Sequence, residues 1–287
     1  DERVRIVGQL VGGGFGGKED ISGQIHAALL ANATGKPVKL LFSRHESLLV
    51  HPKRHATQIK VKLGAKRDGQ LTAVETELYG DTGAYASLGE KVMTRATTHS
   101  AGPYDVPHVR ADCYAMYTNN PPAGAFRGFG VTQSAFAVES MMDMLAEKLG
   151  IDPIELRYKN ALHVGSLTNT GQVLQDSVGL QECIRKVQAE MQRIAGLEHP
   201  ELPLFESHPV PGSPHLRRAW GIAVAYKNTG LGGGAPDKSG AEVELFPDGT
   251  LEVRTSAAEL GQGLVTVLRM IVAEEFSLPP GSVNVLV

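Results

Sequence analysis

Three glycine-rich turns, each leading directly into a segment with helical spacing, constrain the fold of this chain more than any other feature. They are LVGGGFGGKEDISGQ at 10–24, NNPPAGAFRGFGVTQ at 119–133 and AAELGQGLVTV at 257–267. The start of a helix presents backbone N–H groups without partners inside the helix, and such groups bind anions and polar heterocycles. The three turns therefore predict that several helix starts converge on one large polar ligand that carries phosphate.

The first turn, taken alone, matches two phosphate-binding patterns. Gly12, Gly14 and Gly17 fit the dinucleotide pattern G-x-G-x-x-G. Gly12, Gly17 and Lys18 nearly fit a P-loop, but a P-loop needs Ser or Thr after the lysine to bind magnesium. Glu19 stands there instead and would put a carboxylate against the phosphates. The P-loop is disfavoured, whereas a dinucleotide loop and a tight turn without a ligand both stay open from this segment.

The composition is that of a soluble globular protein, with 42% hydrophobic and 21% charged residues. A net charge of −3 without a strongly basic half gives no electrostatic basis for binding nucleic acid or an anionic membrane. No apolar run reaches the roughly 20 residues of a membrane helix, and the N-terminus does not resemble a signal peptide. Cys113 and Cys183 have neither metal-ligand spacing nor a disulfide framework, which indicates reduced thiols in a cytoplasmic protein.

The hydrophobic periodicity predicts an α+β fold in which mixed sheets and helices form two lobes. We expect a first lobe at 1–195, a linker rich in Pro and His at 196–218, and the start of a second lobe at 219–287. The expected helices are 22–33, 133–149, 178–194, 264–276 and a helix that begins at 152–153, where Asp152 caps and Pro153 occupies the first turn. The expected extended segments are 3–10, 38–42, 56–63, 71–79, 219–227, 241–246, 251–256 and 283–287, with a hairpin turn at 66–69 and a loop-rich region at 80–130.

Taken together, GGGFGGKE, AGAFRGFGVTQ and ELGQGL resemble the molybdenum-binding subunit of the molybdenum hydroxylases, the xanthine dehydrogenase and aldehyde oxidase family. The resemblance runs from about 11 to 180 and again over 220–276, and the three motifs stand in the family's order. It implies that the loops hold a molybdopterin cofactor, in bacteria often extended as molybdopterin cytosine dinucleotide. The match of the first turn to the dinucleotide pattern is then a coincidence.

The resemblance also implies which residues contact that cofactor. Backbone amides of two turns would surround the metal, the third turn would hold the pterin or its phosphate, and no residue of this chain would ligate molybdenum directly. These cofactor-binding residues are Gly14, Phe15, Gly16, Ala125, Phe126, Arg127, Gly261, Gln262 and Gly263. From the residues alone, Arg127 is also compatible with a buried ion pair, and Glu259 is expected to serve the start of a helix.

The reaction implied by the resemblance is hydroxylation of a carbon next to a heterocycle nitrogen, or of an aldehyde. Oxygen comes from water through a Mo–OH group, a glutamate acts as general base, hydride passes to Mo=S and electrons leave through iron–sulfur clusters. The family's general-base glutamate lies in a G-V-G-E-type motif that this chain does not contain. We therefore expect a fragment, or one piece of a split molybdenum subunit, that is inactive alone.

Four residues point to a purine-type substrate by the same resemblance. Glu19 follows GGGFGGK, where purine-oxidising members have Glu, and Arg95 lies nine residues before Tyr104, in the spacing of the family's substrate arginine. A carboxylate and a guanidinium on opposite sides would orient the heterocycle and stabilise charge that develops on it. Phe15 and Phe129 match phenylalanines that sandwich the ring. Purely structural roles for Glu19, at a helix start, and for Arg95, in a surface ion pair, stay open.

The partners implied are the remaining segments of the molybdenum subunit, an iron–sulfur subunit and, in some assemblies, an FAD subunit. An aldehyde-oxidising or nicotinate-type molybdenum hydroxylase is the alternative within the family. A NAD(P)-binding oxidoreductase and a non-catalytic scaffold subunit are alternatives outside this chemistry. The presence of Phe15, Arg95 and Phe129 together argues against a scaffold, which would not need all three.

Overall fold

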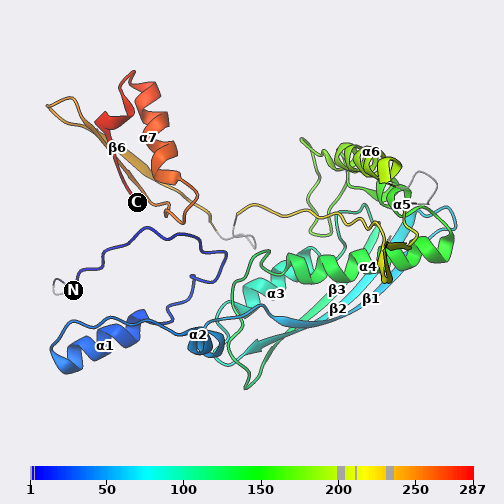
Figure 1. Ribbon diagram of the computed structural model, residues 1–287, viewed down its shortest axis with the longest axis horizontal. Coiled ribbons are helices and arrows are strands. Elements are labelled where there is room, and N and C mark those ends of the chain that lie inside the picture. Colours follow the sequence, from blue (N-terminus) through cyan, green and yellow to red (C-terminus); the bar gives the residue numbers. More distant parts are fainter. Residues whose placement is uncertain (1, 3, 199–203, 211, 231–235) are drawn as a thin grey trace. The chain divides into compact units, whose positions relative to one another are not determined.

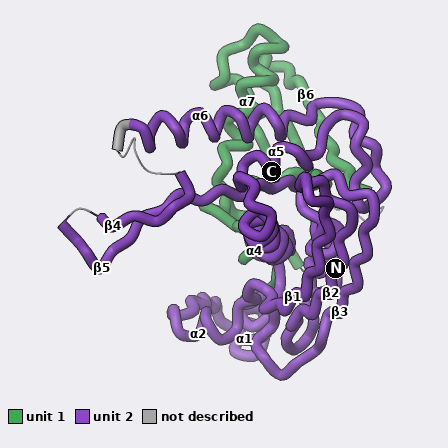
Figure 2. The backbone as a smooth tube through the Cα atoms, turned by 90° about the vertical axis from the view of Figure 1, so that its right-hand side faces the viewer, with its two compact units in different colours: residues 1–21, 228–287 green, residues 22–227 purple. Residues whose placement is uncertain are grey.

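The computed structural model describes residues 2, 4–198, 204–210, 212–230 and 236–287. Contacts between residues divide the chain into two compact units (Figure 2). Unit 1 comprises 1–21 and 228–287, and unit 2 comprises 22–227. The first glycine turn thus shares a unit with the C-terminal segment, whereas the sequence placed the two in different lobes. Both units mix helices with sheets, as the sequence predicts.

The centre of unit 2 is a three-stranded sheet in the order β1 (Ala56–Ala65), β2 (Leu71–Gly83) and β3 (His108–Tyr117) (Figure 1). Strands β1 and β2 are antiparallel and joined by a tight turn, which confirms the hairpin predicted from their alternating polar and apolar residues. Gly69 provides the positive φ of 85° that this turn requires. Strands β2 and β3 are parallel, so the chain must cross over between them.

One face of this sheet is covered by two helices, α3 (Gly89–Thr98) and α4 (Val131–Leu149) (Figure 1). Helix α3 is part of the crossover between β2 and β3. Alternate residues of β2, including Val74, Thr76 and Leu78, are buried beneath the helices. The opposite face carries exposed ion pairs between β1 and β2, such as Lys62 with Glu75. The result is a two-layer arrangement with one apolar and one polar sheet face.

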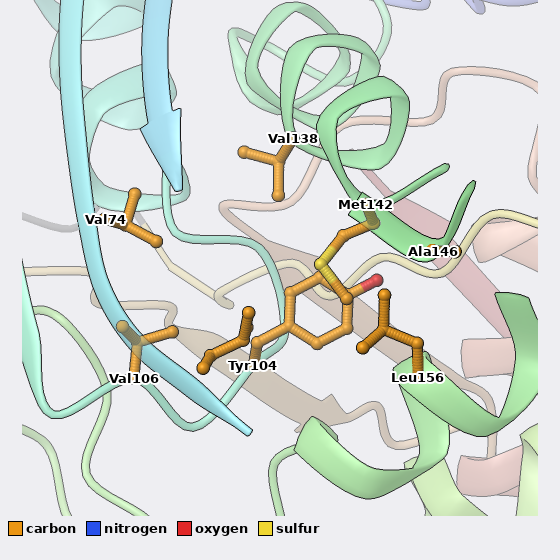
Figure 3. Close-up of a cluster of buried hydrophobic side chains, with 8 residues drawn as sticks. Val74, Tyr104, Val106, Val138, Met142, Ala146 and Leu156 are labelled. Carbon is orange, nitrogen blue, oxygen red and sulfur yellow. The ribbon is translucent and has the colours of Figure 1, made fainter. Parts of the chain in front are cut away.

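The largest buried cluster of unit 2 fills the space between β2, α4 and the chain before β3 (Figure 3). Val74, Val138 and Met142 surround the ring of Tyr104 in this cluster. The Tyr104 hydroxyl donates to Glu139 over 2.5 Å, and the fully buried Arg157 pairs with Glu139 over 2.8 Å. The polar groups beside this cluster thus find charged or polar partners, as burial demands.

Three of the remaining helices of unit 2 begin within two residues of the predicted starts: α1 (Gln24–Thr34), α5 (Pro153–Asn160) and α6 (Leu180–Glu198). The fourth, α2 (Arg44–Val50), was not predicted. Asp152 caps α5 by accepting from the N–H groups of Ile154 and Glu155, with Pro153 in the first turn, as predicted. Gly150 ends α4 in the left-handed conformation with a φ of 64°.

Unit 1 contains a second three-stranded sheet, with β7 (Leu251–Thr255) between β6 (Ala241–Leu245) and β8 (Val283–Leu286). Helix α7 (Leu264–Glu275) connects β7 to the parallel strand β8, with a short 3₁₀ turn, η1 (Pro280–Ser282), before β8. Leu251, Val253, Val272, Ala273, Val283 and Val285 form its buried core. The predicted strands at 241–246, 251–256 and 283–287 and the helix at 264–276 are confirmed.

Several predicted elements are wrong. Residues 4–10 and 38–42 belong to none of the described sheets, and Leu41 is 84% exposed. Residues 219–227 alternate between half-buried and exposed but belong to none of the described strands. A short apolar run favours a β-strand, but it does not show whether the fold places another strand beside it for hydrogen bonding.

Two regions expected to lack regular structure contain it. The region 80–130 holds α3 and β3. Strands β4 (His208–Val210) and β5 (Ser213–Arg218) form a two-stranded ribbon in the expected linker at 196–218, of which 199–203 and 211 lie outside the described residues. Prolines marked this stretch as a linker, but proline also occurs at the open edge of a small ribbon. None of the helices among the described residues has the length and apolarity to cross a bilayer.

Candidate cofactor and substrate site

The first and third glycine turns pack against each other within unit 1. The N–H of Val11 donates to the carbonyl of Glu259 over 3.2 Å. A Cβ atom added at Gly261, where φ is 102°, would lie 3.2 Å from backbone atoms of Gly12 and Gly13. Glycine is therefore required at 261 both for its backbone conformation and for the close approach of the two turns. Of the three turns grouped by sequence, these two adjoin in the structure.

The first and second turns share a G-F-G tripeptide in which the phenylalanine and the glycine that follows it have positive φ angles in both turns. Phe15 and Phe129 have φ angles of 50° and 51°, in the left-handed region that residues with a Cβ rarely adopt. The glycines that follow them, Gly16 and Gly130, also have positive φ, of 85° and 99°. Backbone strain of this kind costs of order 1–3 kcal/mol per residue and clusters at ligand-binding sites. The two phenylalanines predicted to contact substrate thus share an uncommon left-handed φ.

Glu259 organises the third turn from inside. Its carboxylate accepts from the N–H groups of Gly261, Gly263 and Val265 at 2.7, 3.2 and 3.1 Å. These hydrogen bonds, led by the one from Val265, lower the pKa of Glu259 below its ordinary value. The predicted helix-start role is confirmed, since Glu259 binds N–H groups at the beginning of α7. A phosphate at this turn would have to use donors other than the N–H groups of Gly261 and Gly263.

Gln262 stabilises the same turn. Its side-chain oxygen accepts from the N–H of Leu260 over 2.6 Å, and its Nε2 donates to the carbonyl of Ala258 over 2.9 Å. Both ends of the amide therefore act within the turn. The turn is held in one conformation by its own side chains before any ligand binds.

The second turn is anchored to the sheet on its N-terminal side. The N–H of Gly124 donates to the carbonyl of Lys53 over 2.9 Å, and that of Ala123 to Thr82 over 3.1 Å. Ala125, the first predicted cofactor contact of this turn, is fully buried. Its neighbour Phe126 is 45% exposed. The chain thus leaves the protein interior between these two residues.

On its C-terminal side the second turn lies directly on α3. A Cβ atom at Gly130 would lie 2.1 Å from the carbonyl oxygen of Val92, so only glycine allows this approach. The contact brings Phe129 to the part of α3 that carries Arg95. The guanidinium carbon of Arg95 lies 5.5 Å from the centroid of the Phe129 ring, a cation–π distance. The structure therefore brings together two of the four predicted substrate residues.

Arg95 is 9% exposed and lies in the last turn of α3. His99, one turn further on, hydrogen-bonds through Nδ1 to the Arg95 carbonyl over 2.8 Å. The His99 ring lies 4.7 Å from that of Tyr226. Burial, and then the charge of Arg95, lower the pKa of Lys227 beside it. Positive charge gathers around the end of α3, which favours a ligand that is anionic or that gains negative charge.

Glu19 and Phe15 lie in unit 1, on the first turn. Phe15 is 68% exposed. The chain around the Glu19 carboxyl removes part of its hydration, and this desolvation, followed by repulsion from Asp20, raises the pKa of Glu19.

Sequence reasoning missed Arg54, which contacts the second turn at three points. Its NH2 donates to the carbonyl of Arg127 over 2.6 Å, its NH1 donates to Thr132 over 2.5 Å, and its guanidinium carbon lies 4.5 Å from the centroid of the Phe126 ring. Arg54 stands two residues before the start of β1 and is 73 positions from Arg127 in sequence. No local pattern marks such a contact.

The first glycine turn exposes bare backbone. A Cβ atom at Gly12 would meet nothing within 4 Å, and one at Gly14 would meet only the Leu260 side chain, at 3.9 Å. Bare backbone of this kind lets a planar ligand approach to hydrogen-bonding distance.

Comparison with known proteins agrees with this geometry. Two family models described as molybdopterin cofactor-binding domains match residues 1–161 and 206–287. The chain is 52% identical over 198 residues to the nicotinate dehydrogenase large molybdopterin subunit of Eubacterium barkeri, covering 69% of this chain and 47% of that protein. It is 36% identical to a xanthine dehydrogenase molybdenum-binding subunit of Escherichia coli over 99% of this chain and 37% of the relative. The chain thus spans less than half the length of both relatives.

The fold is also that of a solved structure. Aldehyde oxidoreductase from Desulfovibrio gigas matches with a TM-score of 0.76 and 28% identity over 96% of this chain and 29% of that chain. The dinucleotide-fold alternative lacks the strands it needs at 4–10 and 38–42, where the described chain forms none. The chain belongs to the molybdopterin-binding domains of the molybdenum hydroxylase family, which includes xanthine dehydrogenases and aldehyde oxidoreductases.

Proposed function

We propose that this chain is the part of a molybdenum hydroxylase that binds the molybdopterin and orients an electron-poor N-heterocycle, with a purine as the substrate. The contact between Arg95 and Phe129 carries the proposal. It places a buried cation against an aromatic face at the edge of a cofactor turn. A flat, electron-poor ring that gains negative charge during oxidation matches both groups.

The proposed roles divide between the turns. Backbone groups of Gly14, Phe15 and Gly16, with those of Ala125–Arg127 and Gly261–Gly263, would hold the cofactor. The molybdenum group, when bound, supplies the two-electron oxidation. Residues of this chain bind and orient the substrate. Phe15 and Phe129 would contact the ring faces, and Glu19 would share a proton with a ring nitrogen.

Arg95 would stabilise the charge that develops on the ring. A guanidinium keeps its positive charge at every working pH and presents several donors, so it can follow the shift of charge from nitrogen to exocyclic oxygen. Its burial strengthens this interaction, because few water molecules are left to screen it. Glu19 and Arg95 together thus provide one titratable group and one permanent charge.

Oxidation also requires groups outside this chain. We propose that the remaining molybdenum-subunit segments supply the general-base glutamate and that iron–sulfur clusters, with FAD in some assemblies, accept the electrons. The relatives are named as subunits, which supports this division of labour. The chain alone would then bind the cofactor without turning over substrate.

A nicotinate-type substrate is the second candidate. The 52% identity to a nicotinate dehydrogenase subunit favours it. The positive charge of Arg95 and Lys227 would suit the carboxylate of nicotinate as well as the ring of a purine. An aldehyde, which has no ring nitrogen, would use neither Glu19 nor this charge.

The test is molybdenum analysis of the complete native complex, followed by turnover of xanthine, hypoxanthine, nicotinate and benzaldehyde. We expect about one molybdenum per complex and turnover of a purine. Glu19→Ala and Arg95→Ala should each reduce purine turnover far more than aldehyde turnover, while Lys62→Ala, an exposed ion-pair residue, serves as the control. Equal losses on both substrates would reject the purine assignment. Turnover of nicotinate alone would establish the second candidate, and a complex without molybdenum or pterin would reject the function.

A further inference from the structure

The second glycine turn has a conformation that its own hydrogen bonds do little to stabilise. Gly128, Phe129 and Gly130 have positive φ angles of 94°, 51° and 99° in succession. The backbone bonds inside the turn are short-range, from the N–H of Phe129 to the carbonyl of Phe126 over 2.7 Å and from Val131 to Gly128 over 3.1 Å. A run of unfavourable φ values persists only where surrounding structure holds it.

Arg54 stabilises this conformation through contacts from outside the turn. One arm of its guanidinium reaches the Arg127 carbonyl in the middle of the turn, and the other reaches the Thr132 hydroxyl in the first turn of α4. Its guanidinium covers the Phe126 ring at 4.5 Å. The two hydrogen bonds and the ring contact therefore span the strained residues from both sides.

The chemistry of these contacts is specific to arginine. A guanidinium is planar, donates in two directions at once and stacks on an aromatic ring. A lysine ammonium is a single compact donor and cannot make all three contacts together. Both acceptors, the Arg127 carbonyl and the Thr132 hydroxyl, are neutral, so neither neutralises the positive charge of Arg54. Packing also lowers the pKa of Arg54 through desolvation, which agrees with a guanidinium held against the protein.

Arg54 is also tied to the sheet through its neighbours in sequence. Lys53 forms a bridge with Ala123, and the N–H of Gly124 donates to the Lys53 carbonyl. His55, on the other side, is 2% exposed and hydrogen-bonds to Thr82 of β2. The backbone at 53–55 is therefore fixed, and the Arg54 side chain extends from a rigid base.

We propose that Arg54 is a positioning residue that locks the segment Ala125–Gly130 of the second glycine turn in the conformation in which it meets the cofactor. The role of the turn rests on the proposed function, whereas the locking by Arg54 does not. Without Arg54 the turn would sample other conformations, and Phe129 would lose its fixed place over Arg95.

The test compares Arg54→Ala and Arg54→Lys with wild type and with Lys62→Ala in the complete complex. Lys62 is a matched control, since it lies on β1 near Arg54 in sequence but makes only an exposed ion pair with Glu75. Amide hydrogen exchange is measured for the peptide that covers 124–130 and for the β1–β2 hairpin. Molybdenum content and turnover per bound molybdenum are measured on the same samples.

We expect Arg54→Ala to speed exchange in the 124–130 peptide about tenfold or more while the hairpin stays as in wild type. Turnover per bound molybdenum should fall about 10–100-fold, the usual effect of removing a group that orients a cofactor contact. Arg54→Lys should recover only a minor part of the protection from exchange and of the turnover that Arg54→Ala loses. Lys62→Ala should match wild type. Full rescue by lysine would overturn the proposal, because charge alone would then suffice.

Unchanged exchange at 124–130 in Arg54→Ala would also overturn the proposal. So would an equal acceleration in the hairpin, because the effect would then be general unfolding. A wild-type complex without molybdenum, in which Arg54→Ala still loosens the turn selectively, would reject the proposed function and support the locking by Arg54. The two hypotheses thus fail separately.

Discussion

The guanidinium carbon of Arg95 lies 5.5 Å from the centroid of the Phe129 ring, which joins helix α3 to the second glycine turn. The two residues are 34 positions apart in sequence and meet because Gly130 allows the turn to touch the backbone of α3. The predicted substrate arginine and the predicted ring-contacting phenylalanine are therefore one structural unit. A ligand that displaces either side chain must also disturb the other.

A double-mutant cycle tests this coupling. Arg95→Met, Phe129→Leu and the double variant are compared with wild type by urea unfolding. Because Arg95 is nearly buried, we expect an interaction free energy of about 0.5–2 kcal/mol. Additive effects of the two single changes would mean that the contact contributes nothing to stability.

Gly130 has two structural roles: it adopts a positive φ, and it leaves room for the Val92 carbonyl. A comparison of Gly130→Ala with Gly165→Ala separates these roles. The φ angles are similar, 99° and 94°, but a Cβ at Gly165 meets nothing within 4 Å. Gly165→Ala should cost about 1–2 kcal/mol, the penalty of a left-handed backbone. Gly130→Ala should cost several kcal/mol more, since its Cβ would overlap the Val92 carbonyl. Equal losses in chemical denaturation would show that α3 moves aside freely.

Acid should loosen the third turn through Glu259. Because folding lowers the pKa of Glu259 from 4.5, its carboxylate stabilises the fold above pH 4.5, and this contribution disappears as the pH falls through the lower folded-state value. Glu259→Gln should therefore be less stable than wild type near neutral pH, and the difference should shrink on acidification. Glu147→Gln, an exposed change on α4, is the control. A difference that stays constant from neutral pH to well below pH 4.5 in thermal melts would refute this account.

The buried pair of Arg157 and Glu139 should be sensitive to removal of one partner. Arg157→Met leaves the Glu139 carboxylate buried without its cation and should cost about 3–5 kcal/mol. Adding Glu139→Gln removes the uncompensated charge, so the double variant should recover part of the loss. Arg185→Met, which breaks an exposed pair with Glu155, should have a much smaller effect. Urea unfolding of the wild type and the three variants gives the comparison, and no recovery in the double variant would argue against charge burial as the cause.

The elements that local sequence determines were predicted well. The hairpin of β1 and β2 has alternating side chains and a turn that ends in Gly69, and α5 has Asp152 and Pro153 at its start. These signals lie within a few residues of the structure they specify. Helix α3 escaped prediction because its sequence, GEKVMTRATT, contains three threonines, which weaken a helix. It is held by contacts with the sheet.

In the candidate site, too, local sequence determines some features and the tertiary fold determines others. Glycine motifs identified the turns, since a left-handed φ or a close approach leaves few choices of residue. The motifs could not show that Gly261 adjoins Gly12 or that Glu259 uses the N–H groups of Gly261 and Gly263. Arg54 was missed because its partners lie more than 70 residues away. Contacts of this kind depend on the tertiary fold.

Unit 1 is discontinuous, because 1–21 and 228–287 are separated by the whole of unit 2. During synthesis the first glycine turn leaves the ribosome about 250 residues before the third turn against which it packs. Joining them closes a long loop, at an entropic cost that grows only slowly with loop length. The packing of the first turn against the third therefore follows the synthesis of the whole of unit 2.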